Sequence, residues 1–185
     1  MAVHDLGQGV RLWTRDEWDA RSPRPMSANG VIREVFIHHT TDPRAEGIDK
    51  LVEQAAAMRG IQGFHMDTRG YSDISYAFVI FQPYGGLENA RVFQGRETEF
   101  APAAQLNHNR GTLPICVFGN FDRDDGVKPE TIVAIVQTIK WVERHHDGSL
   151  VTVGGHRDVT GTECPGDTLY AKVGEIARKT MLRRF

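Results

Sequence analysis

One short stretch near the C-terminus carries two side chains that can bind transition metals. His156 and Cys164 stand eight residues apart in the segment His-Arg-Asp-Val-Thr-Gly-Thr-Glu-Cys-Pro, whose glycine and proline disfavour helix. Such a loop can fold back and aim both side chains at one point. Imidazole and thiolate are good zinc ligands, and His38, at the end of its own expected strand, could supply a third. Three protein ligands leave a fourth position for water, which is typical of a catalytic zinc site.

The same residues allow two other interpretations. Cys164 could be a small buried apolar residue, with His156 a hydrogen-bonded loop residue. Alternatively, Cys164 could be the nucleophile of a cysteine protease or transferase, with His38 or His156 as its base. Spacing alone does not separate these interpretations from a zinc site. The other cysteine, Cys116, lies within an apolar strand pattern and is expected to be inert core.

Short β-branched and aromatic segments predict the strands that position these side chains. The strongest signal is Ser-Tyr-Ala-Phe-Val-Ile-Phe, and the turn sequence Pro-Tyr-Gly-Gly that follows it predicts an antiparallel hairpin. The last expected strand runs straight into Gly154-Gly155-His156. The expected strands are 34–38, 75–81, 91–93, 115–118 and 150–153.

Apolar residues at helical spacing predict three helices. The first is expected to end at Gly60, the second to begin at Pro129, and the third to begin near Asp167. Their inward-facing apolar positions are Ile48, Leu51, Val52, Ala55 and Met58; Ile132, Ile135, Val136, Ile139 and Val142; and Leu169, Val173, Ile176 and Ala177. Strands interleaved with helices predict an α/β fold, with a mixed central sheet flanked by about three helices.

Length and composition narrow the class of protein. The chain has 185 residues, which suits one domain, and 40% of them are apolar, enough for a packed core. Its 22 basic and 24 acidic residues give a net charge of −2, which argues against a nucleic-acid binder that depends on a basic field. Two cysteines are too few for a disulfide scaffold. The N-terminal residues lack the features of a secretory signal, and no apolar run is long enough for membrane insertion.

Five ordered motifs resemble one family, the zinc amidases of the peptidoglycan recognition protein and T7 lysozyme type (N-acetylmuramoyl-L-alanine amidase, type 2). The resemblance covers roughly residues 12–175. The longest motif, Phe-His-Met-Asp-Thr-Arg-Gly-Tyr-Ser-Asp-Ile-Ser-Tyr, is close to the corresponding family segment. The motifs are Glu17–Arg21, Phe36–Thr40, Phe64–Tyr76, Gly155–Val159 and Thr162–Gly166.

The resemblance implies a zinc ion held by His38, His156 and Cys164. It places the Tyr76 phenol beside the zinc, where it would bind the attacking water or the developing oxyanion. Thr162 stands where the T7-type enzyme has lysine and many recognition-protein amidases have threonine, so it could only donate an uncharged hydrogen bond. The implied reaction is hydrolysis of the amide between N-acetylmuramic acid and the L-alanine of the stem peptide, with peptidoglycan as the partner.

Other polar residues are predicted to support the site, to contact substrate or to lie on the surface. His38 and His39 are neighbours on an expected strand, so their side chains should point to opposite faces. We therefore expect His39 to support the metal site or lie in the core rather than bind metal. It is also a candidate substrate-binding residue. Asn107 and His108 belong to an Asn-His-Asn segment that resembles the T7-type loop, and they are candidate substrate-binding residues. The remaining predictions are that His65 packs at a helix end and that His145 and His146 lie on the surface.

The resemblance leaves functional alternatives. Some recognition proteins bind peptidoglycan without hydrolysing it after losing the metal set, usually at the cysteine, whereas this chain keeps all the implied ligands. A second role as a polymerase inhibitor, as in the T7 enzyme, is another alternative. We expect residues 1–185 to form a single catalytic domain, with residues 1–30 as an extension packed on it, and the protein to be a monomer. Absence of a signal or wall-binding module favours a phage endolysin, made in a host cytoplasm and acting on the wall.

Overall fold

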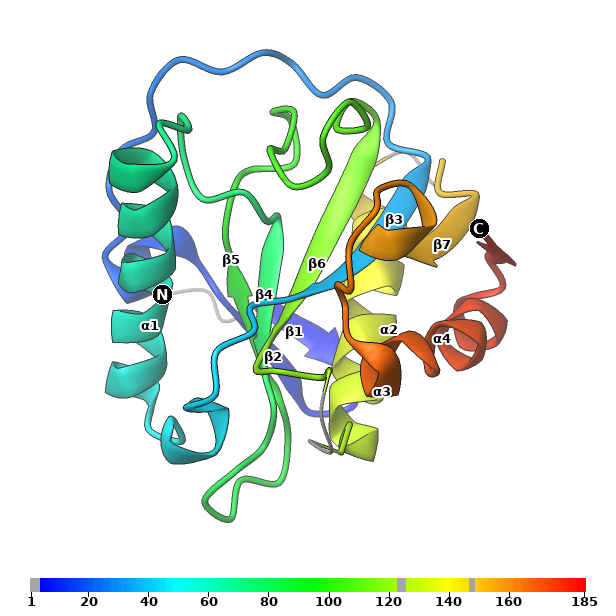
Figure 1. The fold of residues 1–185 in the computed structure, drawn as a ribbon. Helices are drawn as coiled ribbons and strands as arrows, with labels where there is room; N and C mark the ends of the chain where they lie inside the picture. The colour runs from blue at the N-terminus through cyan, green and yellow to red at the C-terminus, as the bar shows by residue number, and fades with distance from the viewer. Residues whose placement is uncertain (1–3, 123–125, 147–148) are drawn as a thin grey trace.

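The computed structural model describes residues 4–122, 126–146 and 149–185. The expected N-terminal extension therefore begins, at residues 1–3, outside the described part of the chain. Eight strands form a single sheet in the order β1-β2-β5-β4-β6-β3-β7-β8 (Figure 1). The strands are β1 His4–Gly7, β2 Val10–Trp13, β3 Glu34–His39, β4 Phe78–Phe81, β5 Arg91–Gln94, β6 Thr112–Phe118, β7 Thr152–Gly155 and β8 Arg183–Arg184.

The sheet is mixed, as predicted. β3 pairs in parallel with β6 and β7, and β4 pairs in parallel with β6. The pair β4–β5 is antiparallel, as the turn sequence between them predicts. Strands β1 and β2 form a hairpin at one edge of the sheet, and β2 joins β5 in parallel, so residues 4–13 belong to the central sheet.

Three main helices and one short helix flank the sheet. They are α1 Leu51–Gly63, α2 Pro129–His145, α3 Asp167–Tyr170 and α4 Val173–Thr180. The expected third helix is thus split in two. At the split the Lys172 N–H bonds to Leu169 O, three residues back, which tightens the backbone and interrupts the α-helical pattern. None of the helices in the described ranges is long and apolar enough to span a membrane.

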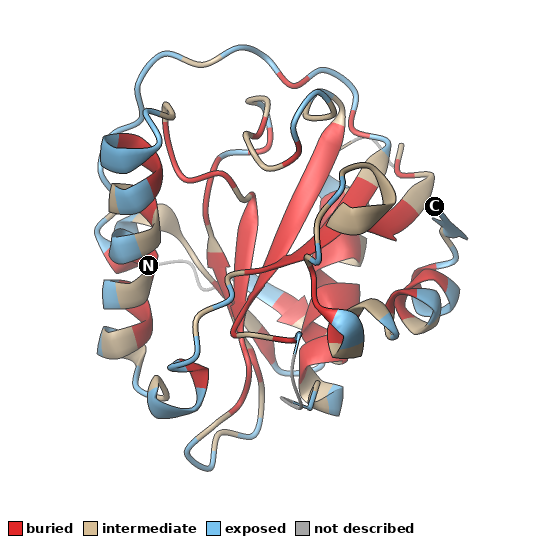
Figure 2. Cartoon of the chain, viewed as in Figure 1, coloured by how far each residue is buried: buried red, intermediate tan, exposed pale blue. Residues whose placement is uncertain are grey.

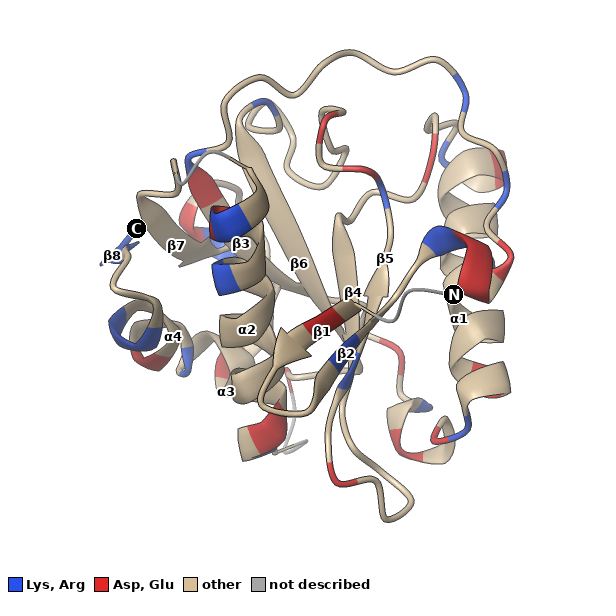
Figure 3. Ribbon diagram, turned by 180° about the vertical axis from the view of Figure 1, so that it is seen from behind, with Lys and Arg blue, Asp and Glu red and all other residues tan. Residues whose placement is uncertain are grey.

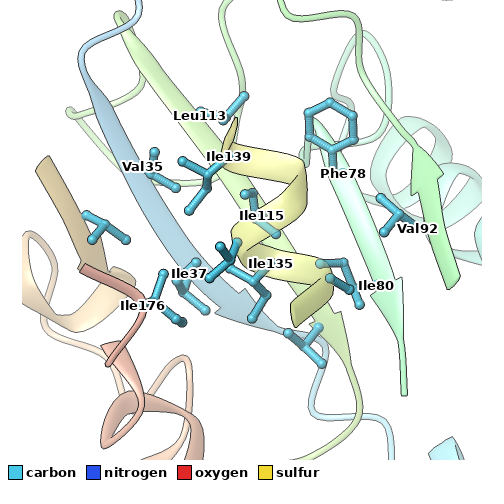
Figure 4. Close-up of a cluster of buried hydrophobic side chains, with 14 of the residues drawn as sticks. Val35, Ile37, Phe78, Ile80, Val92, Leu113, Ile115, Ile135, Ile139 and Ile176 are labelled. Atoms are coloured by element: carbon cyan, nitrogen blue, oxygen red, sulfur yellow. The ribbon is translucent and has the colours of Figure 1, made fainter. Parts of the chain in front are cut away.

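One face of the sheet is covered by α2 and α4. The stripe predicted on α2 is buried, and its isoleucines meet apolar side chains from β3, β4 and β6 (Figure 4). Alternate residues of each strand supply that layer, for example Val35 and Ile37 of β3 and Ile115 of β6. This is the larger of the two apolar clusters and contains most of the buried core (Figure 2).

The opposite face is covered by α1 and the segment before β3. Its cluster is smaller and contains Trp18, Met58 and Phe118. Here two expectations were wrong. Val52 is 68% exposed, because the helix turns Gln54 inward instead, where its side-chain amide bonds to Ile48 O and to Arg91. Helix α1 also runs through Gly60 to Gly63, since a helical glycine costs only about 1 kcal/mol.

Two of the strand boundaries that differ from the expected ones lie next to Tyr76 and His156. β4 begins at Phe78, so residues 75–77 are irregular. β7 extends to Gly155, so the strand delivers His156 directly into the following turn. In both cases, side-chain pattern locates the strand but not where it ends, because the boundary depends on which neighbours offer backbone partners.

Candidate metal centre

His38, His156 and Cys164 meet at the carboxyl ends of β3 and β7. One candidate ligand atom from each lies within 4.8 Å of the other two. Parallel pairing of β3 with β7 brings the two histidines to the same sheet edge, and their rings are 4.5 Å apart. Cys164 returns to this edge because the loop after His156 closes on itself through a hydrogen bond from Arg157 N–H to Cys164 O.

Asp158 fixes the start of that loop. Its Oδ2 accepts a hydrogen bond of 2.7 Å from Gly155 N–H, immediately before His156. Its other oxygen accepts the Tyr170 hydroxyl at 2.5 Å, and Arg184 of β8 pairs with the same carboxylate at 2.7 Å. These contacts lower the pKa of Asp158, against the opposing effect of its burial. The carboxylate therefore ties the histidine loop to α3 and to the C-terminal strand.

The spacing of the donor atoms suits a tetrahedral zinc ion. Cys164 Sγ is 3.6 Å from His38 Nδ1. Zinc bonds of about 2.3 Å to sulfur and 2.0–2.1 Å to nitrogen, at the tetrahedral angle, would separate those two atoms by about 3.6 Å. In addition, His156 Nε2 is buried and has no hydrogen-bond partner within the described residues, so it is free to bind a metal. One cysteine and two histidines are thus a donor set and a spacing that fit zinc.

Burial keeps both imidazoles neutral, which is the form that binds a metal. Burial is the main cause that lowers the pKa of His38 well below its usual value, with His156 and His39 adding to it. Burial followed by the proximity of His39 lowers the pKa of His156. Burial raises the pKa of Cys164 to about 12, although the His39 N–H, 3.4 Å from the sulfur, opposes this. A cation at this point would reverse the balance and favour the thiolate.

The three side chains lie at the edge of a cavity of about 1150 Å³ between α1 and the loop after β7. Its wall includes Ala57, Gly60 and Ile61 of α1, and Thr162 and Glu163 of the loop. A cavity of this size exceeds the usual range for small-molecule pockets, about 300–1,000 Å³. It can therefore take a segment of a polymer as well as a small molecule.

Tyr76 and Thr162, which the family resemblance places near the metal, both line this cavity. The Tyr76 ring lies 5.4 Å from that of His38. Burial raises the pKa of Tyr76 well above its usual value, so the phenol stays a hydrogen-bond donor. The Thr162 Oγ1 accepts the Cys164 N–H at 3.3 Å, which leaves its own proton to donate.

His39 lies beside the ligands without joining them. Its side chain is 4% exposed, and its Nδ1 accepts a hydrogen bond from Phe121 N–H. Its Nε2 is 3.9 Å from an oxygen of Asp122. Its backbone N–H contacts the Cys164 sulfur, as described above. Although strand alternation predicts that His39 points away from His38, both residues contribute to the cavity wall.

Asn107 and His108 lie elsewhere. Asn107 is in a turn with φ +62°, and His108 Nε2 is 2.6 Å from a carboxylate oxygen of Glu34. The His108 ring packs edge-on against Phe36. Neither residue is among those that line the cavity, whereas Ala103 and Ala104 from the same region are.

The structure adds three residues that sequence reasoning did not place in the site. His65, Arg69 and Tyr71 also line the cavity. His65 was expected only to pack at a helix end. It sits in a wider π turn, 64–68, that continues α1, and its Nδ1 accepts the Ser75 N–H at 3.1 Å. That contact leaves Nε2 as the protonated nitrogen of the neutral ring. The available signal was the motif Phe64–Tyr76 itself, which contains all three residues.

The expected surface histidines differ from each other. His145 is exposed and stacks on Trp141, with ring centroids 4.4 Å apart. His146 is half-buried, and its Nε2 lies 3.1 Å from the Thr98 hydroxyl. The prediction was correct for His145, and for His146 it was wrong, because the end of α2 meets the loop after β5.

Comparisons with known proteins agree with this geometry. Residues 28–167 match the profile of the N-acetylmuramoyl-L-alanine amidase family. Peptidoglycan-recognition protein SC1a/b of Drosophila simulans is 31% identical over 170 residues, which are 91% of this chain and 86% of that protein. An N-acetylmuramoyl-L-alanine amidase of Sus scrofa is 29% identical over 155 residues, 80% of this chain and 24% of that protein.

A solved structure supports the fold. Drosophila PGRP-LB superposes with a TM-score of 0.77 at 27% identity, covering 89% of this chain and 93% of that one. A tyrosine-to-phenylalanine variant of the same protein has been solved in complex with tracheal cytotoxin. The mixed sheet with its flanking helices is therefore the peptidoglycan recognition protein-like fold that the sequence motifs predict.

Proposed function

The chain belongs to the N-acetylmuramoyl-L-alanine amidase family, and we propose that it is a zinc-dependent hydrolase of bacterial peptidoglycan. The bond cleaved is the amide between N-acetylmuramic acid and the L-alanine of the stem peptide. The observation that carries the proposal is the convergence of His38, His156 and Cys164, with candidate ligand atoms within 4.8 Å, at a cavity wide enough for a polymer segment.

Zinc bound there would supply a Lewis acid that polarises the amide carbonyl and lowers the pKa of water. Side chains that line the cavity would supply the remaining interactions with the substrate. The Tyr76 phenol, held protonated by burial, donates a hydrogen bond to the carbonyl oxygen as it gains negative charge. The Thr162 hydroxyl, on the loop wall, is a second uncharged donor for the same oxygen. His65 Nε2–H and the Arg69 guanidinium face the substrate from the α1 side of the cavity.

The proposal separates two functions within this family. Several similar proteins are named as recognition proteins, and one is solved with a bound ligand, so binding without hydrolysis is the second candidate. A binder needs the cavity but not the metal cluster. The complete donor set, in which the buried His156 Nε2 has no partner among the described residues, favours hydrolysis.

Mass spectrometry of digested peptidoglycan tests the proposal. The zinc-loaded protein should release stem peptides with a free N-terminal alanine from intact sacculi and leave glycan strands with unsubstituted muramic acid. Cys164→Ser should abolish this release yet still sediment with the sacculi. His145→Ala, a change of an exposed histidine outside the cavity, is the matched control and should keep wild-type activity.

Two results would contradict the proposal. Release of sugar or peptide fragments without amide cleavage would identify a different hydrolase. Sedimentation with sacculi in the absence of any product, with zinc present, would identify a recognition module. Activity on intact sacculi as well as on soluble muropeptides is the behaviour required of a wall-lysing enzyme such as an endolysin.

A further inference from the structure

The segment that brings Tyr76 to the cavity has no regular structure of its own. Residues 69–77 lie outside any helix or strand, between the turn that continues α1 and the start of β4. Even so, residues 73–75 are at most 3% exposed. Buried backbone groups outside regular structure need hydrogen-bond partners from elsewhere in the chain. The position of Tyr76 therefore depends on the groups that supply those partners.

Arg96, which follows β5 closely, donates to this segment from both its side chain and its backbone. Its Nε donates to Ile74 O at 2.8 Å, and its Nη2 donates to Asp73 O at 3.0 Å. Its backbone N–H donates to Tyr76 O at 2.8 Å. One residue thus holds carbonyl oxygens on both sides of Ser75, which fixes the course of the segment.

The same guanidinium holds a second part of the cavity wall. Its Nη1 donates to Ala101 O at 2.5 Å, and the nearby Ala103 and Ala104 line the cavity. A planar guanidinium has N–H donors in fixed directions and can span two segments, whereas the ammonium of a lysine is a single point of charge. Arg96 is not among the residues that line the cavity, so it acts on them through the backbone.

Gly95 allows this close approach. A Cβ at Gly95 would lie 2.3 Å from Tyr76 O, so any side chain there would push the Tyr76 backbone away from the Arg96 N–H. The segment in turn holds His65, because Ser75 N–H donates to His65 Nδ1 at 3.1 Å. The course of the segment therefore determines the places of two cavity side chains, the Tyr76 phenol and the His65 ring.

Stability alone does not account for a cation in this place. Arg96 is 4% exposed, and burying a charge costs free energy that a packed apolar side chain would not. Burial lowers the pKa of Arg96, and the charge of Asp73 opposes this. That carboxylate pairs with Arg15 at 2.9 Å and accepts Gln62 Nε2 at 2.6 Å, so it is not reserved for Arg96. The carbonyl contacts are the specific interactions that the guanidinium makes.

We propose that Arg96 is a positioning residue for Tyr76 and His65. It fixes the backbone of residues 73–76, which places the Tyr76 phenol in the cavity and keeps Ser75 N–H on His65 Nδ1. The inference rests on the proposed amidase function, because its effect on turnover requires the phenol to bind the reacting carbonyl.

Arg96→Lys tests this role because it keeps the charge and removes the fork. The variant should lower kcat by up to about 100-fold, the cost of displacing a catalytic group by about 1 Å, and kcat should fall more than KM rises. If this variant does not fold, two others replace it. Arg96→Gln removes the buried charge together with the fork, and Gly95→Ala displaces the same Tyr76 carbonyl. Both should lower kcat in the same way.

Two controls separate positioning from a general loss of structure. Arg59→Lys removes another guanidinium–carbonyl hydrogen bond, from Arg59 to Trp18 O at 2.9 Å, at a residue that does not line the cavity. Ile139→Ala lowers stability from α2, on the other face of the sheet. Both controls should keep the wild-type kcat when assayed below the unfolding transition.

The tautomer of His65 gives a measurement that needs no turnover. While Ser75 N–H donates to Nδ1, the neutral ring carries its proton on Nε2. In zinc-loaded protein at neutral pH, the nitrogen NMR signal of His65 Nδ1 should be that of an unprotonated nitrogen, and His65→Asn identifies it among the eight histidines. Arg96→Lys should move this signal toward the protonated position, whereas Arg59→Lys and Ile139→Ala should leave it in place.

A double-mutant cycle completes the test. If Arg96 acts through Tyr76, the loss of kcat in Arg96→Lys combined with Tyr76→Phe should be smaller than the product of the two single losses. An unchanged kcat or an unmoved His65 signal in Arg96→Lys, a fully multiplicative loss, or an equal loss in Ile139→Ala would each overturn the inference. A wild-type protein without amidase activity would refute the proposed function, while the His65 signal would still report whether Arg96 holds the segment.

Discussion

The two faces of the sheet are built from the same strands and differ in what covers them. On one face, α2 and α4 close over a continuous apolar layer (Figure 4). On the other, α1 covers only part of the sheet and leaves the cavity beside the ends of β3 and β7. Strand β3 shows the contrast within one segment, since Val35 and Ile37 enter the closed layer and His38 faces the cavity.

The closed face is a large apolar cluster between the sheet and its helices. The buried hydroxyls of Thr138 on α2 and Thr180 on α4 are satisfied by hydrogen bonds to the helix backbone. The open face contains groups that a core would exclude, including buried imidazole nitrogens without partners. Unpartnered buried polar atoms reduce stability, so they are expected where a ligand completes them. Stability and function are therefore separated onto opposite faces of one sheet.

Charge does not follow the same division. Lys, Arg, Asp and Glu are interspersed on the view from behind, with acidic and basic residues on α4 and at the hairpin edge (Figure 3). Under the proposed function, we therefore expect substrate affinity to come from groups that line the cavity, such as Arg69 and His65, rather than from a general field.

Removal of a proposed ligand should give the largest effect on the open face. His156→Ala leaves two of three ligands, and zinc affinity and amidase activity should fall by more than the roughly 10- to 100-fold that loss of an outer contact causes. The free energy of unfolding of the metal-free protein should stay the same or rise, because the variant loses a buried nitrogen without a partner. Isothermal titration with zinc and urea denaturation measure the two effects. A strongly destabilised metal-free variant would show that this face contributes to the core.

The opposite pattern is expected for Ile139→Ala on α2. Ile139 is fully buried in the closed layer, so truncation should lower the free energy of unfolding by about 2–5 kcal/mol. Zinc affinity of the folded protein should match the wild type, since the substitution touches the other face. Urea denaturation followed by zinc titration below the transition measures both. Loss of zinc binding in the folded variant would mean that the two faces are coupled.

A smaller effect, on the pH dependence of the free energy of unfolding, is expected from a residue of the open face. Burial, followed by the positive charges of Arg96 and Arg69, lowers the pKa of His65 to about 4. The unfolded chain, with a histidine pKa of about 6.5, takes up this proton first as pH falls. The neutral ring's contribution to stability is therefore complete above about pH 6.5 and is lost as pH falls through 4, by at most about 3 kcal/mol.

His65→Asn should flatten this part of the profile. The asparagine Oδ1 can accept the Ser75 N–H in place of Nδ1, and the side chain does not titrate. Urea denaturation of metal-free protein between pH 4 and 7 measures the difference from wild type. His145→Asn, at an exposed position, is the control and should leave the slope unchanged. Equal slopes in wild type and His65→Asn would show that His65 takes up a proton without loss of stability.

Side-chain periodicity located most of the elements because burial repeats with the geometry of the element itself. The α2 stripe of Ile132 to Val142 and the apolar run in β6 needed no knowledge of their partners. Element ends were less accurate. The late start of β4, at Phe78 and not at residue 75, and the continuation of α1 past Gly60 were mispredicted, because the ends depend on which backbone groups neighbouring segments offer.

The sequence by itself determined the ligand types, the order of the strands along the chain and the family motifs. Only the tertiary structure decided that the ligand atoms lie within 4.8 Å, that His65 lines the cavity, and that Cys116 lies beside His38 on the neighbouring strand. His38 and Cys116 are adjacent because β3 and β6 pair in one particular register, although 78 positions separate them in the sequence. That register is fixed by the apolar layer on the closed face, since a one-residue slip would turn its side chains toward the cavity.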